Sequence, residues 1–78
     1  MMKRQQKAVQ TGRIKRYIET PNMLVVLEVP VIFAPEDPEE PLLEAKTLKF
    51  LDEAKRRADA GDRRWLAKVG RVFDRSVA

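Results

Sequence analysis

The stretch from Met23 to Phe33 reads MLVVLEVPVIF, and it decides the fold of this 78-residue chain. It is rich in β-branched residues and too short for a capped helix, so the pattern predicts a strand over about residues 23–33. Side chains alternate between the two faces of a strand. One face carries Met23, Val25, Leu27, Val29, Val31 and Phe33, and the other carries Leu24, Val26, Glu28, Pro30 and Ile32.

Both faces of this strand are mostly apolar, so one layer of helices would not hide them. Pro30 has no N–H to donate, which predicts that the strand lies at a sheet edge or contains a bulge. A long apolar edge strand pairs with another chain unless something covers it. The question for the remaining sequence is therefore how much cover it supplies.

Downstream, an apolar stripe with helical spacing predicts a helix over about residues 43–60. The stripe consists of Leu43, Thr47, Phe50, Leu51, Ala54 and Ala58. Gly61 suits a left-handed position after this helix, and Asp62 suits the N-cap of a second helix over about residues 63–69. Val72 and Phe73 predict a short closing strand over about residues 71–75.

The segments on either side of the apolar strand are less decisive. Ile14, Tyr17 and Ile18 fit one or two helical turns, but the alternation of residues 14–18 also fits a short strand. Thr20-Pro21-Asn22 is a turn sequence. Residues 34–41, APEDPEEP, are expected to be a connector, because three prolines and four acids suit neither a helix interior nor a central strand.

The predicted architecture is a small single α+β domain over residues 13–78, preceded by a flexible basic arm over residues 1–12. The arm carries too little apolar surface to offset the entropy of ordering it. Pairing of residues 14–18 with the apolar strand as a hairpin is the alternative that would make a self-sufficient monomer.

Charge is segregated along the chain, although the net charge is only +4. Residues 1–20 carry six cations and one acid, residues 21–45 carry six acids and no cation, and residues 46–78 carry ten cations and five acids. The basic ends either attract an anionic partner such as nucleic acid or pair with the acidic middle of the chain. The sequence leaves both interpretations open.

The residue inventory argues against catalysis. The chain has neither cysteine nor histidine, and its only serine, Ser76, lacks a partner for nucleophilic activation. The acids of residues 36–40 are expected in a wet loop that does not desolvate a carboxyl for acid–base work, and their spacing is not that of an EF-hand. We expect no enzymatic activity, no cofactor and no metal site.

The apolar run also follows a basic segment, as in a secretory signal, but Glu28 and Pro30 interrupt it. It is too short to span a membrane. We therefore expect no membrane partner and a cytoplasmic location, with which the lack of cysteine is compatible.

The leading functional hypothesis is a non-catalytic protein-interaction module that self-associates, as a homodimer, or captures a partner strand. The reason is the shortage of cover for the apolar strand, which pairing with a copy of itself would relieve. The expected anchors are Val25, Leu27, Val29 and Val31, supported from the helices by Phe50 and Trp65.

The alternative is sequence-nonspecific nucleic-acid binding through the basic arm and the arginine-rich junction around Gly61. That junction has a superficial likeness to a helix-turn-helix, but the second helix is short and has no Asn, Gln or Ser to contact base edges. Trp65 is expected to belong to the core rather than to stack on a base. The candidate contacts are Arg13, Lys15, Arg16, Arg56, Arg57, Arg63, Arg64, Lys68 and Arg71.

Overall fold

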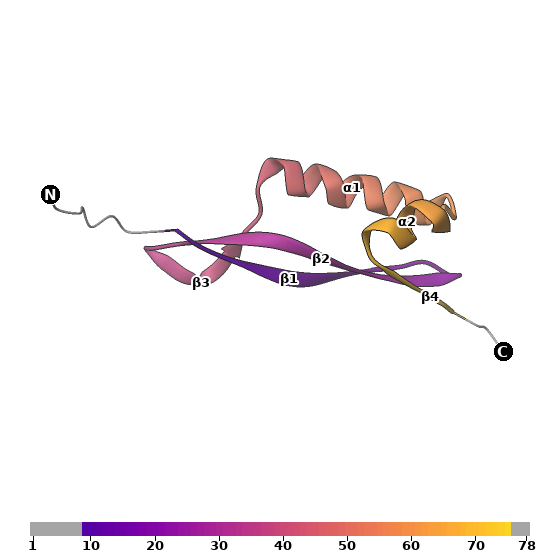
Figure 1. Cartoon of the computed structure of the whole chain (residues 1–78), viewed down its shortest axis with the longest axis horizontal. Helices are drawn as coiled ribbons and strands as arrows, with labels where there is room; N and C mark the ends of the chain where they lie inside the picture. Colours follow the sequence, from indigo (N-terminus) through magenta and orange to yellow (C-terminus); the bar gives the residue numbers. More distant parts are fainter. Residues whose placement is uncertain (1–8, 76–78) are drawn as a thin grey trace, which may run out of the picture.

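The structure, a computed structural model, describes residues 9–75 and has the predicted α+β class. Its strands are β1 (Gln10–Glu19), β2 (Met23–Ala34), β3 (Asp37–Leu42) and β4 (Arg71–Asp74). Its helices are α1 (Ala45–Asp59) and α2 (Arg63–Val69). The four strands form one antiparallel sheet, and both helices lie on the same face of it (Figure 1).

The predicted apolar strand is β2, and it is the central strand of the sheet rather than an edge. β1 pairs with it from Gln10↔Phe33 to Glu19↔Leu24. On the other edge β4 pairs with Met23–Val26, and β3 pairs with Ile32 and Ala34. Residues 27–31 therefore have no strand on that second side within the described chain. Pro30 lies in this gap, where a missing N–H costs no bond to β3 or β4.

β1 resolves the ambiguity of residues 13–20 in favour of a strand. Thr20-Pro21-Asn22 forms the predicted turn, in which the Thr20 N–H donates to the Met23 carbonyl at 2.9 Å. Thr20 Oγ1 also accepts from the Met23 N–H at 3.1 Å. The apolar strand therefore pairs with β1 in a hairpin, which is the alternative that the sequence analysis considered. Residues 10–12 belong to it rather than to an arm, and residues 1–8 of the predicted arm lie outside the described residues.

The expectation of a connector at residues 34–41 was wrong, because most of that segment is strand β3. Its six residues, Asp37–Leu42, are all exposed, and its pairing with β2 shifts register between Ile32 and Ala34. Both prolines of β3 are tolerated because this strand lies at an edge of the sheet, where not every N–H needs a partner. Composition alone did not distinguish such an edge strand from a loop.

The junction of the two helices follows the predicted signals. α1 begins two residues later than Leu43 and ends at Asp59, and Gly61 has a positive φ of 76°. The Gly61 N–H donates to Ala58 O at 3.0 Å, and the Asp62 N–H donates to Arg57 O at 2.9 Å, which is the Schellman pattern. Asp62 then caps α2 by accepting from the Trp65 N–H at 3.2 Å.

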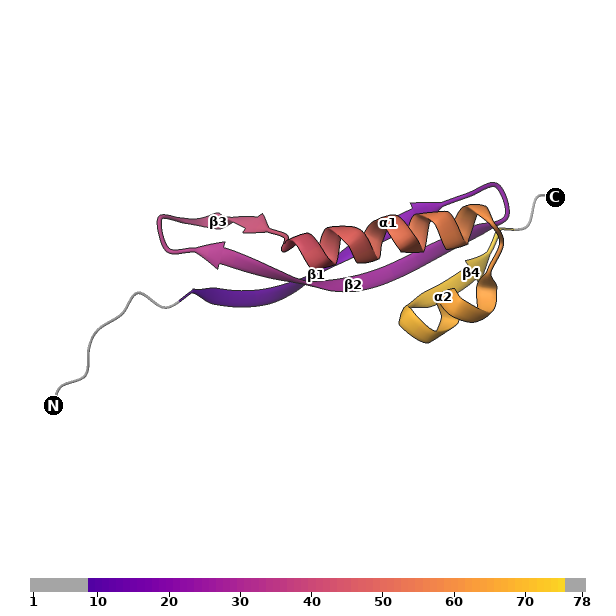
Figure 2. The same ribbon diagram turned by 90° about the horizontal axis from the view of Figure 1, so that it is seen from above.

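The core lies between β2 and the helices. Val25, Leu27, Val29 and Val31 are at most 1% exposed. Ala54, Ala58 and Leu66 are buried opposite the sheet, and Phe50 and Trp65 pack against this cluster as predicted. Viewed from above, α1 runs along the hairpin while α2 lies beside β4 (Figure 2). The other face of the sheet has no helix over it among the described residues.

Candidate functional site

The uncovered face of the sheet contains a shallow basin between β1, β2 and β4. Its volume is about 620 Å³. Nine residues line it: Arg13, Lys15, Tyr17, Val26, Glu28, Val69, Gly70, Arg71 and Phe73. They come from four elements, because β2 holds β1 on one side and β4 on the other while the end of α2 closes one rim.

Strand register explains why these particular residues meet. Tyr17 pairs with Val26, and Val26 pairs with Arg71 on its other side, so the three form one row across the sheet. Lys15 pairs with Glu28 one row further along this face, and Arg13 follows opposite Pro30. The side chains of these rows share a face because strand residues alternate with a period of two.

Positive charge dominates the basin, which has three cations and one carboxylate among its lining residues. Arg13 Nε lies 3.6 Å from Glu28 Oε1, and both side chains are more than half exposed. Lys15 and Arg71 have no carboxylate within ion-pair distance in the described residues. Both charges are therefore available to an anionic ligand.

Two aromatic side chains in the basin are exposed to solvent. Tyr17 is 62% exposed and Phe73 is 47% exposed. The Arg71 guanidinium lies 6.0 Å from the centre of the Phe73 ring. Phe73 pairs with Leu24, in the row next to that of Tyr17, so ordinary strand spacing puts their Cα atoms about 12 Å apart.

The structure places the four predicted anchor residues away from any surface. Val25, Leu27, Val29 and Val31 all face the helices and are buried by this chain alone. A partner would reach them only after α1 and α2 had moved. The shortage of cover that motivated the strand-mediated interface is absent on this face, because the helices and the hairpin supply that cover.

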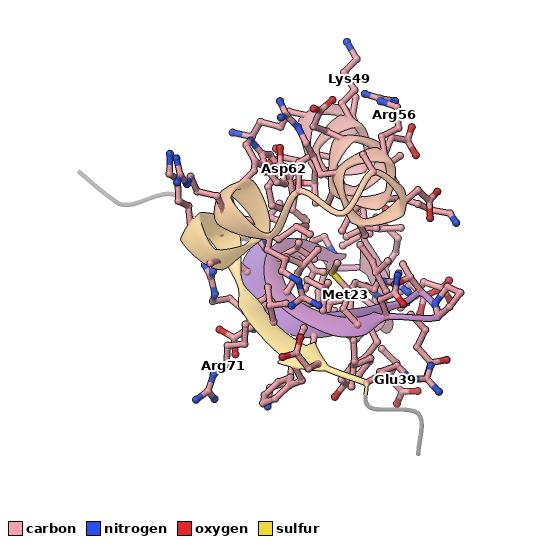
Figure 3. All side chains as sticks on the ribbon, turned by 90° about the vertical axis from the view of Figure 1, so that its right-hand side faces the viewer. Met23, Glu39, Lys49, Arg56, Asp62 and Arg71 are labelled. Atoms are coloured by element: carbon pink, nitrogen blue, oxygen red, sulfur yellow. The ribbon has the colours of Figure 1, made fainter. Side chains whose placement is uncertain are left out.

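The predicted nucleic-acid contacts lie in four places. Arg13, Lys15 and Arg71 meet in the basin. Arg16 is exposed on β1 but pairs with Leu27 and so belongs to the helix side of the sheet. Arg64 and Lys68 are exposed on α2. The remaining three, Arg56, Arg57 and Arg63, are held in ion pairs within the chain. Figure 3 shows Arg56 and Arg71 on opposite sides of the molecule.

Arg57 is the centre of the α1–α2 junction. Its guanidinium donates to Glu53 Oε2 at 2.6 Å and to Asp62 Oδ2 at 2.8 Å, and it lies 5.1 Å from the centre of the Trp65 ring. The bond from Arg57 and the Trp65 N–H lower the pKa of Asp62, and bonds from Arg56 and Arg57 lower that of Glu53. The same two carboxylates raise the pKa of Arg57. Arg57 therefore has a structural role at the helix junction.

Reasoning from the sequence missed the aromatic half of the basin. Tyr17 was undecided between helix and strand, and Phe73 was assigned only to a closing strand. The available signal was the alternation Arg13, Lys15, Tyr17, which puts three non-core side chains on one face once a strand is assumed.

No group of three or more acidic, histidine or cysteine residues in the described chain is arranged to hold a metal ion. Of the helices within residues 9–75, none combines the length and the apolar composition needed to cross a membrane. Compared with protein-family models, curated proteins and solved structures, the chain shows no significant match.

Proposed function

We propose that this protein is a small non-catalytic domain that binds nucleic acid through the uncovered face of its sheet. The observation that carries the proposal is the basin, whose lining combines Arg13, Lys15 and Arg71 with two exposed aromatic rings. Cations that contact phosphates displace counterions from the nucleic acid, and this release supplies affinity that is independent of base sequence. This relocates the interface from the Gly61 junction to the sheet.

The distribution of charge along the molecule favours the end at which the basin lies. The acidic residues of β3 and of the turn before it lie at one end of the hairpin, whereas α2 and β4 lie at the other end (Figure 1). Arg64, Lys68 and Arg71 are exposed on that second end. A polyanion is therefore attracted to the half of the molecule that contains the basin and repelled from the β3 end.

The carboxylates support a binding role over acid–base catalysis. A general acid needs a carboxyl whose pKa is raised towards neutrality. The two carboxyls with shifted values, Glu53 and Asp62, have lowered pKa values because arginines donate to them. Both belong to the helix junction rather than to the basin.

Titration of a labelled oligonucleotide tests the proposal. We expect Lys15→Gln and Arg71→Gln each to weaken binding and to reduce the slope of log K against log salt by about 0.7–0.9, the value for one phosphate contact. Lys49→Gln is the matched control, because Lys49 projects from α1 on the side of the molecule away from Arg71 (Figure 3). The control should bind as the parent chain does.

Absence of binding at about 50 mM salt would contradict the proposal, because phosphate contacts are strongest at low salt. Equal losses for Lys15→Gln, Arg71→Gln and Lys49→Gln would also contradict it. Such a result would mean that only net charge matters and that the basin has no special role.

Self-association is the second candidate, and the outer edge of β1 is the observation that favours it. Among the described residues β1 pairs only with β2, so its other edge has unpaired backbone groups. Such an edge is a template for a second chain. Arg13, Lys15 and Arg16 lie on this strand, however, and charged edge residues are a common means of preventing that pairing.

A further inference from the structure

We infer that the ligand of the basin is single-stranded nucleic acid, with unpaired bases stacked on Tyr17 and Phe73. This inference rests on the proposed function. It adds that the nucleic acid is single-stranded and names the side chains that recognise it. Phosphate contacts alone do not distinguish a single strand from a duplex. The aromatic rings do, because the base faces they would contact are hidden inside a duplex.

The position of the two rings carries the inference. Both are exposed on the same sheet face. Phe50 and Trp65 pack against the core on the other face, with their ring centres 6.0 Å apart. Four of the five aromatic residues therefore form a core pair and an exposed pair, and the fifth, Phe33, lies outside the basin. An exposed aromatic ring beside cations is the arrangement that stacks on bases while the cations contact the phosphates.

The surroundings of each ring fit this division of roles. Val26, half-buried, lies in the row between Tyr17 and Arg71 and supplies an apolar floor. Lys15 lies beside Tyr17 on the same strand face, and Arg71 lies near Phe73. Each ring thus has its own neighbouring cation, so that both stacking positions are flanked by a contact for phosphate.

The basin also predicts little preference for base sequence. Its lining contains no Asn, Gln, Ser, Thr or His side chain, and the Arg13 guanidinium is engaged by Glu28. Reading a base edge needs a matched pattern of donors and acceptors. Stacking tolerates every base because every base has a π-face.

The test compares one single strand with its own duplex, using labelled oligonucleotides of about 12 nucleotides, a length within the usual range for stacking platforms. DNA and RNA single strands form separate arms, since the basin itself does not distinguish them. We expect the single strands to bind more tightly than the duplex. Tyr17→Leu and Phe73→Leu should each weaken single-strand binding by about fivefold to a hundredfold, the cost of losing one stacked base.

Two further variants keep the test specific. Tyr17→Phe retains the ring and should recover most of the binding that Tyr17→Leu loses. Phe33→Leu makes the same aromatic-to-leucine change outside the basin and should also leave binding intact. Trp65, the only tryptophan, lies on the helix side and reports by fluorescence that each variant is folded.

A second readout is independent of affinity. Tyr17 is the only tyrosine, so its ring protons are a single assignable set in an NMR spectrum. Stacking on a base should move them upfield at saturation with the single strand, while the Trp65 signals stay in place.

The outcomes separate the two proposals. Equal binding of single strand and duplex, with Tyr17→Leu and Phe73→Leu unchanged and Lys15→Gln weakened, would overturn the stacking inference and leave the proposed function standing. Absence of binding to any of these nucleic acids would overturn both.

Discussion

Gly70 lies where α2 ends and β4 begins, close against the backbone of β2. A Cβ at this position would stand 2.4 Å from the Val26 carbonyl oxygen and 2.7 Å from Leu27 Cδ2. Its φ of −165° is ordinary extended backbone, so the position requires glycine for space and not for conformation. This close approach brings Arg71 and Phe73 alongside β2 and thereby completes the basin.

Gly70→Ala should therefore lower the free energy of unfolding by about 1–3 kcal/mol, the usual cost of overpacking. Denaturant unfolding followed by Trp65 fluorescence measures it. Gly61→Ala is the informative comparison, because nothing lies within 4 Å of an added Cβ there and only the positive φ is unfavourable. We expect that variant to lose about 1 kcal/mol. An unchanged stability for Gly70→Ala would mean that β4 is not held tightly against β2.

The α1–α2 junction is the element most dependent on charge. Arg57 joins Glu53 on its own helix to Asp62 at the cap of the next, and its guanidinium covers the Trp65 ring. The caps themselves come from local sequence, because Gly61 and Asp62 satisfy backbone groups at the end of α1 and the start of α2 whatever the helices pack against. The ion-pair network adds a pH dependence to that junction.

Acid should loosen this junction, and the sign follows from the lowered pKa values. In the folded chain the pKa of Asp62 is below its ordinary value of 3.8, and that of Glu53 is below 4.5. Their stabilising contribution is complete above those ordinary values and is lost as the pH falls through the lowered values of the folded chain. Thermal unfolding measured from pH 7 downward should show stability decreasing below about pH 4.

Asp62→Asn identifies the group responsible, because asparagine can still cap α2 but carries no charge. We expect a shallower loss of stability with acid for this variant than for the parent chain. Asp59→Asn, which removes an exposed carboxylate near the end of α1 outside the network, should follow the parent curve. Identical acid curves for Asp62→Asn and the parent chain would contradict the assignment.

The chain as a unit is a long twisted hairpin with both helices on one side (Figures 1 and 2). The helices bury the inner face of β2, and β1, β3 and β4 cover most of its edges. The physical reason for self-association inferred from the sequence, an apolar strand with too little cover, is therefore largely removed. What remains is the outer edge of β1 with its cations, together with residues 27–31 of β2, which have no strand on their second side.

We expect the protein to stay monomeric in light scattering across a concentration series. Replacing the edge charges, as in the double variant Lys15→Val and Arg16→Val, should increase self-association because it removes the barrier to pairing at β1. A parent chain whose mass doubles with concentration would favour the second candidate function. Leu27→Lys does not discriminate, since burying a lysine in this core unfolds the chain whether or not it dimerises.

Local patterns in the sequence were sufficient for β2, both helices and the Gly61–Asp62 junction. Their signals are the apolar run, the helical stripe and the capping residues, and each acts over a few neighbouring residues. The same patterns left residues 13–20 undecided and missed β3, because neither segment has an apolar face strong enough to specify its structure without a partner strand.

Only the tertiary structure assembled the basin. Arg13 and Tyr17 reach it from one end of the chain and Arg71 and Phe73 from the other, and they meet because β1 and β4 pair with opposite edges of β2. Which face of the sheet stays open also depends on where the helices pack. The alternation of side chains predicts that a strand has two faces, whereas long-range pairing and packing determine which face is exposed to solvent.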